Sequence, residues 1–310
     1  MKIAIVGPGA IGCLLGGLLS RAGHEVWLID RRPERAALLD RRGVAISGVG
    51  GDFNASVRAT ASPTEAGIAD LIIVAVKSYD TAAAAQAAQS LVGSLTTVLT
   101  VQNGLGNVEA LQSQLGSDRV VAGITSLGAT RLGPGQVQYA GRGPTVIGEL
   151  DGRVTDRLKE TAGALSSSGL EVETTTAVVS ALWGKLAVNA GVNAVATLAR
   201  VRNESVVQSE SLLGLLRSAV REVEAVAGAK RIEMPEPDMA ARAEEVCRRT
   251  ADNTNSMLQD VRQRRRTEVE AINGAVVREG AAVGVATPVN AVLVALIHGL
   301  EETYEERRTH

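Results

Sequence analysis

In the first half of the chain, short apolar runs alternate with stretches in which apolar residues recur at helical spacing. The apolar runs are 3–6, 25–29, 71–76, 97–101 and 120–124, and the helix-like stretches include 11–22, 33–42, 81–91 and 107–115. This alternation predicts a parallel sheet covered by helices on both faces. Three later runs, 137–139, 145–147 and 171–174, are predicted to add antiparallel strands.

The strand signals end near Ala177, and helical patterns fill the rest of the chain. Breaks near Arg202, around Pro235 and Pro237, near Asn253 and at 284–288 separate four or more predicted helices. Thr267 and Glu270 match a capping box, which predicts that a helix begins there. We therefore expect an α/β fold with two domains, a doubly wound sheet over 1–176 and an all-helical domain over 177–310.

Composition narrows the function classes. Lys and Arg total 32 and Asp and Glu total 34, so the net charge of −2 gives no general attraction to nucleic acid or to anionic membranes. The two cysteines, Cys13 and Cys247, suggest no disulfide framework, and the three histidines form no metal motif. Glycines and a proline interrupt the apolar run 3–19, unlike a signal peptide. We expect a soluble, cytoplasmic protein without a bound metal.

The sharpest motif directly follows the first predicted strand. It reads Gly7, Pro8, Gly9, Ala10, Ile11 and Gly12, and it opens the first predicted helix. In this pattern the first glycine allows a tight turn, the second lets a pyrophosphate approach the backbone, and the third lets the helix and strand pack closely. The second strand ends at Asp30, at the spacing expected for a ribose ligand. The motif predicts that residues 1–176 bind a dinucleotide.

Asp30 and Arg31 point to different dinucleotides. A carboxylate at position 30 would accept hydrogen bonds from the ribose hydroxyls and would repel a 2′-phosphate, which favours NAD(H). Arg31 would pair with that phosphate, which favours NADP(H), and Arg32 adds a second candidate cation. The sequence leaves both cofactors open, and a solvated turn before Pro33 is an equally good interpretation of the arginines.

Two later strand-to-helix junctions carry polar residues where such sheets place their ligands. Lys77 follows the run 71–76, and Asn103 follows the run 97–101 within Gln102-Asn103-Gly104. Taken singly, each residue is more typical of a turn. Their shared position at the ligand edge of the sheet makes both candidate cofactor-binding residues, and Asn103 is also a candidate substrate ligand.

The first predicted helix of the second domain, 178–199, is almost entirely small and apolar. Lys185, Asn189 and Asn193 interrupt it at spacings of four residues, so they form one polar stripe. A solvent-exposed face would carry more charge, whereas one cation among neutral donors suits a small anionic ligand. Lys185 can donate the proton that a carbonyl needs during hydride transfer, and it can attract a substrate carboxylate. We therefore expect an oxidoreductase that acts on 2-oxo acids.

Over nearly its whole length the chain resembles the 2-dehydropantoate 2-reductase (ketopantoate reductase) family. Besides the 7–12 motif and the stripe, the matches are Val76-Lys77, Gln102-Asn103-Gly104, 256–260, Thr267-Glu268 and 272–274. The resemblance implies a Rossmann domain joined to a helical domain like those of 6-phosphogluconate dehydrogenases. It implies reduction of 2-dehydropantoate to (R)-pantoate with NADPH, in pantothenate biosynthesis.

The resemblance also implies roles for individual residues. The general acid falls on Lys185, and the substrate ligands fall on Asn189, Asn193, Asn203 and Ser256. Cofactor contacts fall on Arg31, Lys77, Asn103 and Glu268, and we expect Glu268 to be catalytic as well. Asp30 departs from what a 2′-phosphate would favour.

Three functions remain open at this point. Besides pantoate formation, the stripe would suit a D-2-hydroxyacid dehydrogenase of the same fold that acts on another branched or aromatic 2-oxo acid. A dinucleotide-dependent sensor without turnover is disfavoured by the full set of Lys185, Asn189, Asn193 and Glu268. The expected partners are a small 2-oxo acid and, in a homodimer, a second copy of the chain.

Overall fold

The structure, a computed structural model, describes residues 1–305. The chain folds into two compact units, each with its own core. Unit 1 comprises Met1–Gln102 and Asn107–Val178, and unit 2 comprises Asn103–Gly106 and the chain from Val179 onward. The short segment Asn103–Gly106 therefore packs with unit 2, although both of its neighbouring segments belong to unit 1.

Unit 1 contains an eight-stranded sheet with the order β12-β11-β8-β7-β6-β1-β2-β5. The strands are β1 (Lys2–Val6), β2 (Glu25–Ile29), β5 (Arg58–Thr60), β6 (Leu71–Val74), β7 (Thr97–Thr100), β8 (Val120–Thr125), β11 (Thr145–Gly148) and β12 (Val172–Thr174). The six strands from β5 to β8 are mutually parallel, whereas β11 is antiparallel to β8. The strand order reverses beside β1, which is where an open α/β sheet binds its ligand.

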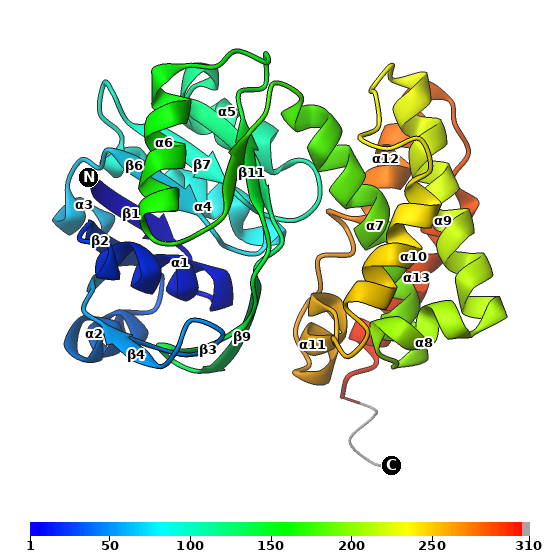
Figure 1. Ribbon diagram of the computed structural model, residues 1–310, viewed down its shortest axis with the longest axis horizontal. Helices are drawn as coiled ribbons and strands as arrows, with labels where there is room; N and C mark the ends of the chain where they lie inside the picture. Colours follow the sequence, from blue (N-terminus) through cyan, green and yellow to red (C-terminus); the bar gives the residue numbers. More distant parts are fainter. Residues whose placement is uncertain (306–310) are drawn as a thin grey trace. The chain divides into compact units, whose positions relative to one another are not determined.

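Helices cover both faces of this sheet (Figure 1). They are α1 (Ala10–Arg21), α2 (Pro33–Arg42), α3 (Pro63–Ala66), α4 (Thr81–Ala88), α5 (Asn107–Leu115) and α6 (Asp156–Ser167), with 3₁₀ turns at Ser78–Asp80, Gln89–Leu91 and Ser117–Arg119. Helices α1 and α6 contact each other, as do α4 and α5. Right-handed crossovers on the two sides of β1 run in opposite directions, so they place α1 and α4 on opposite faces. The predicted doubly wound sheet is confirmed.

A second, four-stranded sheet packs on α1, and only one of its strands is predicted from the sequence. Its order is β4-β3-β10-β9, formed by β3 (Val44–Gly48), β4 (Phe53–Ala55), β9 (Gly128–Gly133) and β10 (Gln136–Gly141). The run 137–139, predicted as an antiparallel addition, lies in β10, which is antiparallel to β9 but parallel to β3. These strands are short and rich in glycine and polar residues, so the apolar alternation that marks a strand is weak.

In the part of the chain that the structure describes, unit 2 is helical apart from its turns. Its helices are α7 (Val178–Ala199), α8 (Asn203–Gln208), α9 (Glu210–Ala229), α10 (Met239–Arg249), α11 (Ser256–Arg262), α12 (Asn273–Val283) and α13 (Pro288–Glu302). Small residues of α7, among them Ala187, Ala190 and Ala194, lie fully buried in the core. The predicted helical second domain is confirmed.

Two buried asparagines join the helices of unit 2. The Asn273 side chain donates to the Ala190 carbonyl of α7 at 3.0 Å and to Asn290 Oδ1 at 2.9 Å. Asn290 in turn donates to Ala219 O of α9 at 3.1 Å and to the Glu222 carboxylate at 2.7 Å. Both asparagines are fully buried, so these bonds lie in a low-dielectric core where an unpaired group is costly. The network holds α12 and α13 against α7.

The predicted capping box at Thr267 is wrong. Helix α12 begins at Asn273, and the Thr267 hydroxyl instead accepts the Val269 N–H at 3.2 Å. Glu270 turns away to accept a hydrogen bond from Arg278 at 2.9 Å and to contact His298. Residues 267–272 therefore form a non-helical turn, which carries Glu268.

Of the described helices, only α7 is long and apolar enough to cross a membrane by length and hydropathy. Within its most apolar window, 61% of the residues are buried inside the protein. That burial is typical of a core helix, which passes the same test of composition.

Candidate active site

The glycine motif forms the turn between β1 and α1. Gly7 has a φ of +97°, and a Cβ there would lie 2.5–2.9 Å from atoms of Val76. A Cβ at Gly12 would collide with the Gly7 carbonyl oxygen. Packing inside the protein therefore accounts for Gly7 and Gly12. It does not account for Gly9, because a Cβ built there meets nothing within 4 Å.

The space beside Gly9 fits a phosphate. Gly9 is the N-cap residue of the twelve-residue helix α1, and no side chain caps that end. Pro8 is buried, whereas Gly9, Ala10 and Ile11 stay partly accessible. Backbone N–H groups at the start of a helix attract anions, so Gly9 leaves room for a pyrophosphate to reach them. These residues fit a dinucleotide.

Lys77 lies beside this turn. It directly follows Val76, whose atoms approach Gly7, and it is partly accessible. β6, which precedes it, pairs with β1 in parallel from Ile3↔Leu71 to Val6↔Val74. The structure thus brings Lys77 and the glycine motif together at the carboxyl edge of the sheet, within unit 1.

Gln102 is a residue that the sequence analysis quoted only as part of a motif. Its amide donates to Val76 O at 2.9 Å and to Thr81 Oγ1 at 2.8 Å, and its carbonyl accepts from Thr100 Oγ1 at 3.0 Å. Thr81 donates onward to Asn107 Oδ1 at 2.8 Å. Gln102 thereby fixes the loop before Lys77 against the end of β7. Its position after a buried strand was the only signal in the sequence.

The Asp30 carboxylate is buried and paired, an arrangement that the sequence did not reveal. Its side chain has no exposed surface. Both of its oxygens accept hydrogen bonds from Arg35 of α2, one of them at 2.9 Å, and Oδ1 also accepts the Arg32 N–H at 3.0 Å. Arg31 lies outside this cluster with 67% of its side chain exposed, and it pairs with Asp80 at 2.9 Å. The guanidinium of Arg35 thus neutralises the carboxylate that would repel a 2′-phosphate.

In unit 2, the stripe of α7 combines residues of different exposure. Asn193 is 6% exposed, whereas Lys185 and Asn189 are partly accessible. The residues around them on α7 are mainly alanine, valine and leucine that pack into the core. The stripe is therefore a polar seam on a core helix, buried at Asn193 and partly accessible at Lys185 and Asn189.

Burial lowers the pKa of the Lys185 ammonium to about 8, although the negative charge of Glu268 opposes that shift. Glu268 is 6% exposed and lies in the turn 267–272. The structure thus places the predicted acid and the predicted carboxylate in one electrostatic environment within unit 2. A lysine with this pKa is still mostly protonated at neutral pH, but it gives up its proton more readily than an exposed lysine.

Asn103 belongs to the same unit as Lys185 and Glu268. The segment Asn103–Gly106 is held against the turn 267–272, because Leu105 N donates to Ala271 O at 2.9 Å. Gly104 has a φ of +79°, and a Cβ there would collide with that same carbonyl oxygen. The glycine is therefore required for the close approach of two backbones.

Asn203 and Ser256 begin two short helices of unit 2, α8 and α11. Asn203 is 7% exposed and donates to Thr250 Oγ1 at 2.8 Å, and its Oδ1 has no hydrogen-bond partner among the described residues. Ser256 is exposed. Its neighbour Asn255, which the sequence analysis missed, accepts hydrogen bonds from Leu258 N at 2.9 Å and Thr197 Oγ1 at 3.4 Å. Within residues 1–305 the Asn255 Nδ2 atom, also buried, lacks a partner.

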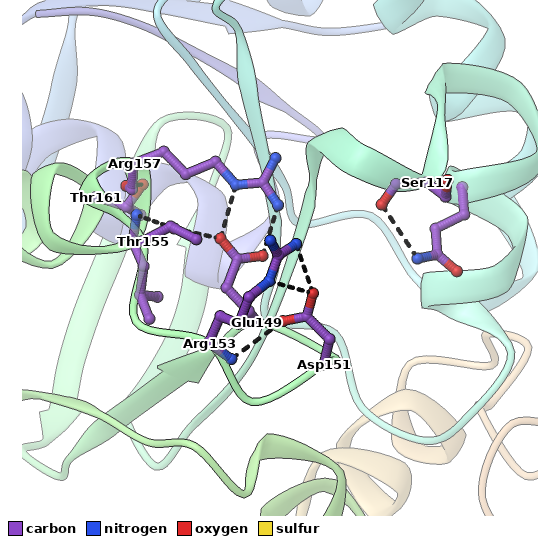
Figure 2. Close-up of polar contacts among 9 residues, drawn as sticks. Ser117, Glu149, Asp151, Arg153, Thr155, Arg157 and Thr161 are labelled. Carbon is purple, nitrogen blue, oxygen red and sulfur yellow. Dashed lines mark hydrogen bonds and ion pairs between the residues drawn. The ribbon is translucent and has the colours of Figure 1, made fainter.

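None of these residues lines the cavity of about 660 Å³ in unit 1. It lies near the start of β8 and the end of the antiparallel β11, at the edge of the sheet opposite the glycine motif. Figure 2 shows that four of its charged side chains, Glu149, Asp151, Arg153 and Arg157, form pairs with one another. Arg157 donates to both oxygens of the buried Glu149, at 2.7 and 2.5 Å, and Arg153 pairs with Asp151 at 2.7 Å. These contacts stabilise the start of α6.

Within residues 1–305, no group of three or more His, Cys, Asp or Glu side chains is arranged to hold a metal ion. His310 lies outside the described residues.

Comparison with known proteins identifies the family. The family model described as ketopantoate reductase PanE/ApbA matches residues 3–152, and its C-terminal counterpart matches residues 177–301. The chain belongs to the ketopantoate reductase PanE/ApbA family. A relative named 2-dehydropantoate 2-reductase from Halobacterium salinarum is 37% identical over 96% of this chain and 98% of its own length.

Solved structures of this family share the whole fold. A PanE/ApbA family ketopantoate reductase from Ralstonia eutropha JMP134 superposes with a TM-score of 0.90 at 34% identity, covering 98% of this chain and all of that one. A D-mandelate dehydrogenase determined with NADH and anilino(oxo)acetate gives 0.92 at 30% identity, covering 98% and 99%. The predicted family and fold are confirmed. The family is one of oxidoreductases that depend on a nicotinamide dinucleotide.

The glycine turn yields a prediction that separates packing from ligand binding. Gly9→Ala should fold with the stability of the wild type, because its Cβ meets no protein atom and its φ of −78° suits any residue. It should weaken dinucleotide binding about tenfold or more, since the added methyl group occupies the place of the pyrophosphate. Thermal unfolding and fluorescence titration with dinucleotide would measure the two effects.

Gly12→Ala is the matched control and should lose stability, because its Cβ collides with the protein itself. Unchanged dinucleotide affinity in a stable Gly9→Ala variant would show that the turn does not hold the pyrophosphate.

Proposed function

We propose that this protein reduces 2-dehydropantoate to (R)-pantoate with NADPH, as in pantothenate biosynthesis. The observation that carries the proposal is the polar seam of α7. Its one cation, Lys185, has a pKa of about 8 and lies within the electrostatic influence of Glu268, while Asn189 and Asn193 lie on the same helix face. These groups match what a 2-oxo acid needs, namely a proton donor for its ketone and donors for its carboxylate.

In this proposal each residue has a distinct task. A reduced nicotinamide, once held by the protein, would supply the hydride for C2 of the ketone. Lys185 Nζ donates a proton to the oxygen of C2 as negative charge develops there, and the asparagine amides donate hydrogen bonds to the substrate. Glu268 favours the charged form of Lys185 and so keeps the acid loaded at neutral pH. The turn 7–12 and Lys77 would hold the dinucleotide phosphates and ribose.

The polar atoms near the end of the seam favour a substrate with a hydroxylated tail. Thr197 lies one turn beyond Asn193 on the same face of α7, and it contacts the buried Asn255. Asn255 Nδ2 and Asn203 Oδ1 offer a buried donor and a buried acceptor without protein partners among the described residues. A substrate hydroxyl could pair with either atom, whereas an apolar tail would leave it unpaired, at a cost of about 1–3 kcal/mol.

A second candidate is reduction of an aromatic 2-oxo acid, and the similarity to D-mandelate dehydrogenase favours it. Trp, Tyr and Phe together make up only 2% of the chain. A pocket for an aromatic tail would therefore have to be lined mainly by aliphatic side chains.

A comparison of three 2-oxo acids would test the proposed substrate. We expect kcat/KM to be highest for 2-dehydropantoate and about tenfold or more lower for 3,3-dimethyl-2-oxobutanoate, which lacks only the hydroxyl. Benzoylformate, the aromatic 2-oxo acid, should be poorer still. A preference for benzoylformate would replace pantoate formation with the second candidate.

The paired state of Asp30 supports NADPH as the cofactor. A buried carboxylate that already accepts hydrogen bonds from Arg35 and from the Arg32 backbone has little capacity left for ribose hydroxyls. Its charge is balanced by a guanidinium, so the repulsion expected for a 2′-phosphate is reduced. Arg31, which is exposed and bound only at its tip to Asp80, is available as the phosphate's partner by a change of side-chain rotamer.

Arg31→Ala should therefore raise the KM for NADPH about tenfold to a hundredfold and barely change that for NADH. The reason is that a charge-assisted hydrogen bond contributes about 1.5–3 kcal/mol and NADH has no 2′-phosphate. Arg41→Ala, which removes an exposed arginine from the last turn of α2, is the matched control and should behave like the wild type. Equal losses for both cofactors would remove Arg31 from the phosphate site.

Lys185→Ala should lower kcat by about a hundredfold to ten-thousandfold, because it removes the general acid. Binding of dinucleotide should change little, since the glycine turn lies in unit 1.

Lys185→Arg should restore substrate binding more than rate, because arginine holds its proton too tightly. In the wild type, reduction should slow as the pH rises through about 8 and Lys185 loses its proton. Single-turnover reduction across pH would measure this, and an unchanged profile in Lys185→Ala would transfer the acid role to another group.

A further inference from the structure

The turn that carries Glu268 is fastened by residues of the last helix, outside the polar seam. The Thr267 N–H, one residue before Glu268, donates to Glu301 Oε1 of α13 at 2.7 Å. Tyr304, just beyond that helix, donates its hydroxyl to the Arg265 carbonyl at 3.0 Å. One bond goes to the main chain at the first residue of the turn 267–272 and the other to the main chain two residues before it. Both therefore restrain the path of the backbone into the turn, whatever side chains it carries.

The other end of the turn is also fixed. Glu270 contacts His298 of α13 at 2.8 Å and accepts from Arg278 of α12 at 2.9 Å. Asn273 then joins the start of α12 to the Ala190 carbonyl of α7, the helix that carries Lys185. Between these anchors, the Glu268 carbonyl accepts the N–H groups of Ala271 and Ile272 at 3.0 and 3.1 Å. Glu268 is thus the central residue of a turn restrained on both sides.

Glu301 is well placed to be the decisive anchor. Only 14% of its side chain is exposed, and its second oxygen lies 3.9 Å from His298 Nδ1. Thr267, which it holds, is 2% exposed, so no solvent could replace the lost acceptor easily. Glu268 is the carboxylate whose charge raises the pKa of Lys185, so Glu301 would act on that lysine through the turn.

We propose that Glu301 is a positioning residue, which holds the turn 267–272 so that the Glu268 carboxylate stays where its charge acts on the Lys185 ammonium. The inference rests on the proposed roles of Lys185 and Glu268. It adds a residue of the C-terminal helix α13, whose carboxylate binds the main chain of the turn and so affects the proton-donating lysine without touching it.

The consequence for Lys185 has a definite sign. Burial pushes its pKa down and Glu268 pulls it up, so a displaced Glu268 leaves burial unopposed. The Lys185 pKa should then fall below its value of about 8, and the acid should lose its proton at a lower pH.

The test titrates the Lys185 amine directly, in the full-length protein. Its reactivity toward acetic anhydride is followed across pH by peptide mass spectrometry, with the exposed Lys159 as internal reference. We expect the midpoint to move down by about half a pH unit or more in Glu301→Ala and in Glu268→Ala. Glu301→Gln keeps a carbonyl acceptor for Thr267 while removing the charge, so it should stay close to the wild type. Glu302→Ala, a neighbouring exposed position on the same helix, should leave the midpoint unchanged.

Kinetics provide the second readout. The pH at which reduction loses half its rate should fall by the same amount in Glu301→Ala, with little change in the KM for the dinucleotide. Tyr304→Phe, which removes the other anchor, should shift both midpoints in the same direction and keeps the test available if Glu301→Ala folds poorly.

Two outcomes separate the inference from the proposed function. A shifted midpoint in Glu268→Ala with an unshifted one in both Glu301→Ala and Tyr304→Phe would overturn the positioning role and leave the proposed reaction intact. A wild type inactive on every 2-oxo acid would overturn the proposed function, while the amine titration would still decide whether Glu301 holds the turn. If Glu301→Gln shifted the midpoint as much as Glu301→Ala, the charge of Glu301 and not its hydrogen bond to the turn would be responsible. That result would also overturn the positioning role.

Discussion

The structure of unit 2 depends on placing one lysine in its most apolar helix. Removing an ammonium from water is costly, and a lysine in such surroundings must lose its proton or find a compensating charge. Here the compensation comes from Glu268, a carboxylate 83 residues further along the chain, in a turn rather than a helix. Hydrogen bonds from α7, α12 and α13 surround this turn and restrain its backbone.

In unit 1, the Asp30 carboxylate beside the candidate dinucleotide site is also buried and compensated by an opposite charge. At the end of β2, a carboxylate that would repel a 2′-phosphate is kept, but it is buried against Arg35 and neutralised. Its function becomes that of an anchor between β2 and α2, since it also binds the Arg32 N–H at the start of that helix. An exposed aspartate at this position would indicate NAD(H). When the aspartate is buried and paired with an arginine, as Asp30 is with Arg35, the position is also compatible with NADP(H).

The glycines near the candidate site are of two kinds. Gly7, Gly12 and Gly104 are needed because another backbone or side chain of the protein lies where a Cβ would be. Gly9 is different, because the protein itself leaves that space open. Only the second kind of glycine is informative about a ligand, and the spacing of the motif alone does not separate the two kinds.

The sequence alone predicts the elements whose apolar period is strong and the motifs that are contiguous or lie on one helix face. It located β2, α2, α5 and α7 at their observed bounds, the glycine turn, and the Lys185, Asn189 and Asn193 stripe. These features depend on local periodicity, which a single strand or helix already expresses. The sequence does not predict the short strands β3, β4 and β9. Their own composition gives little strand signal, and pairing with neighbouring strands stabilises them.

Tertiary structure alone decided which distant groups meet. Three examples are the pairing of Asp30 with Arg35, the influence of Glu268 on Lys185 and the hydrogen bond from Thr267 to Glu301. In each, the two residues lie in different elements, and their spacing along the chain follows no helical or strand period. The burial of Asn255 likewise depends on elements distant in the sequence. The same fact explains why the capping box at Thr267 misled, since a backbone N–H that finds a carboxylate on another helix needs no cap. Charge and hydrogen bonding act over a few ångströms in space, and the distance along the chain does not encode them.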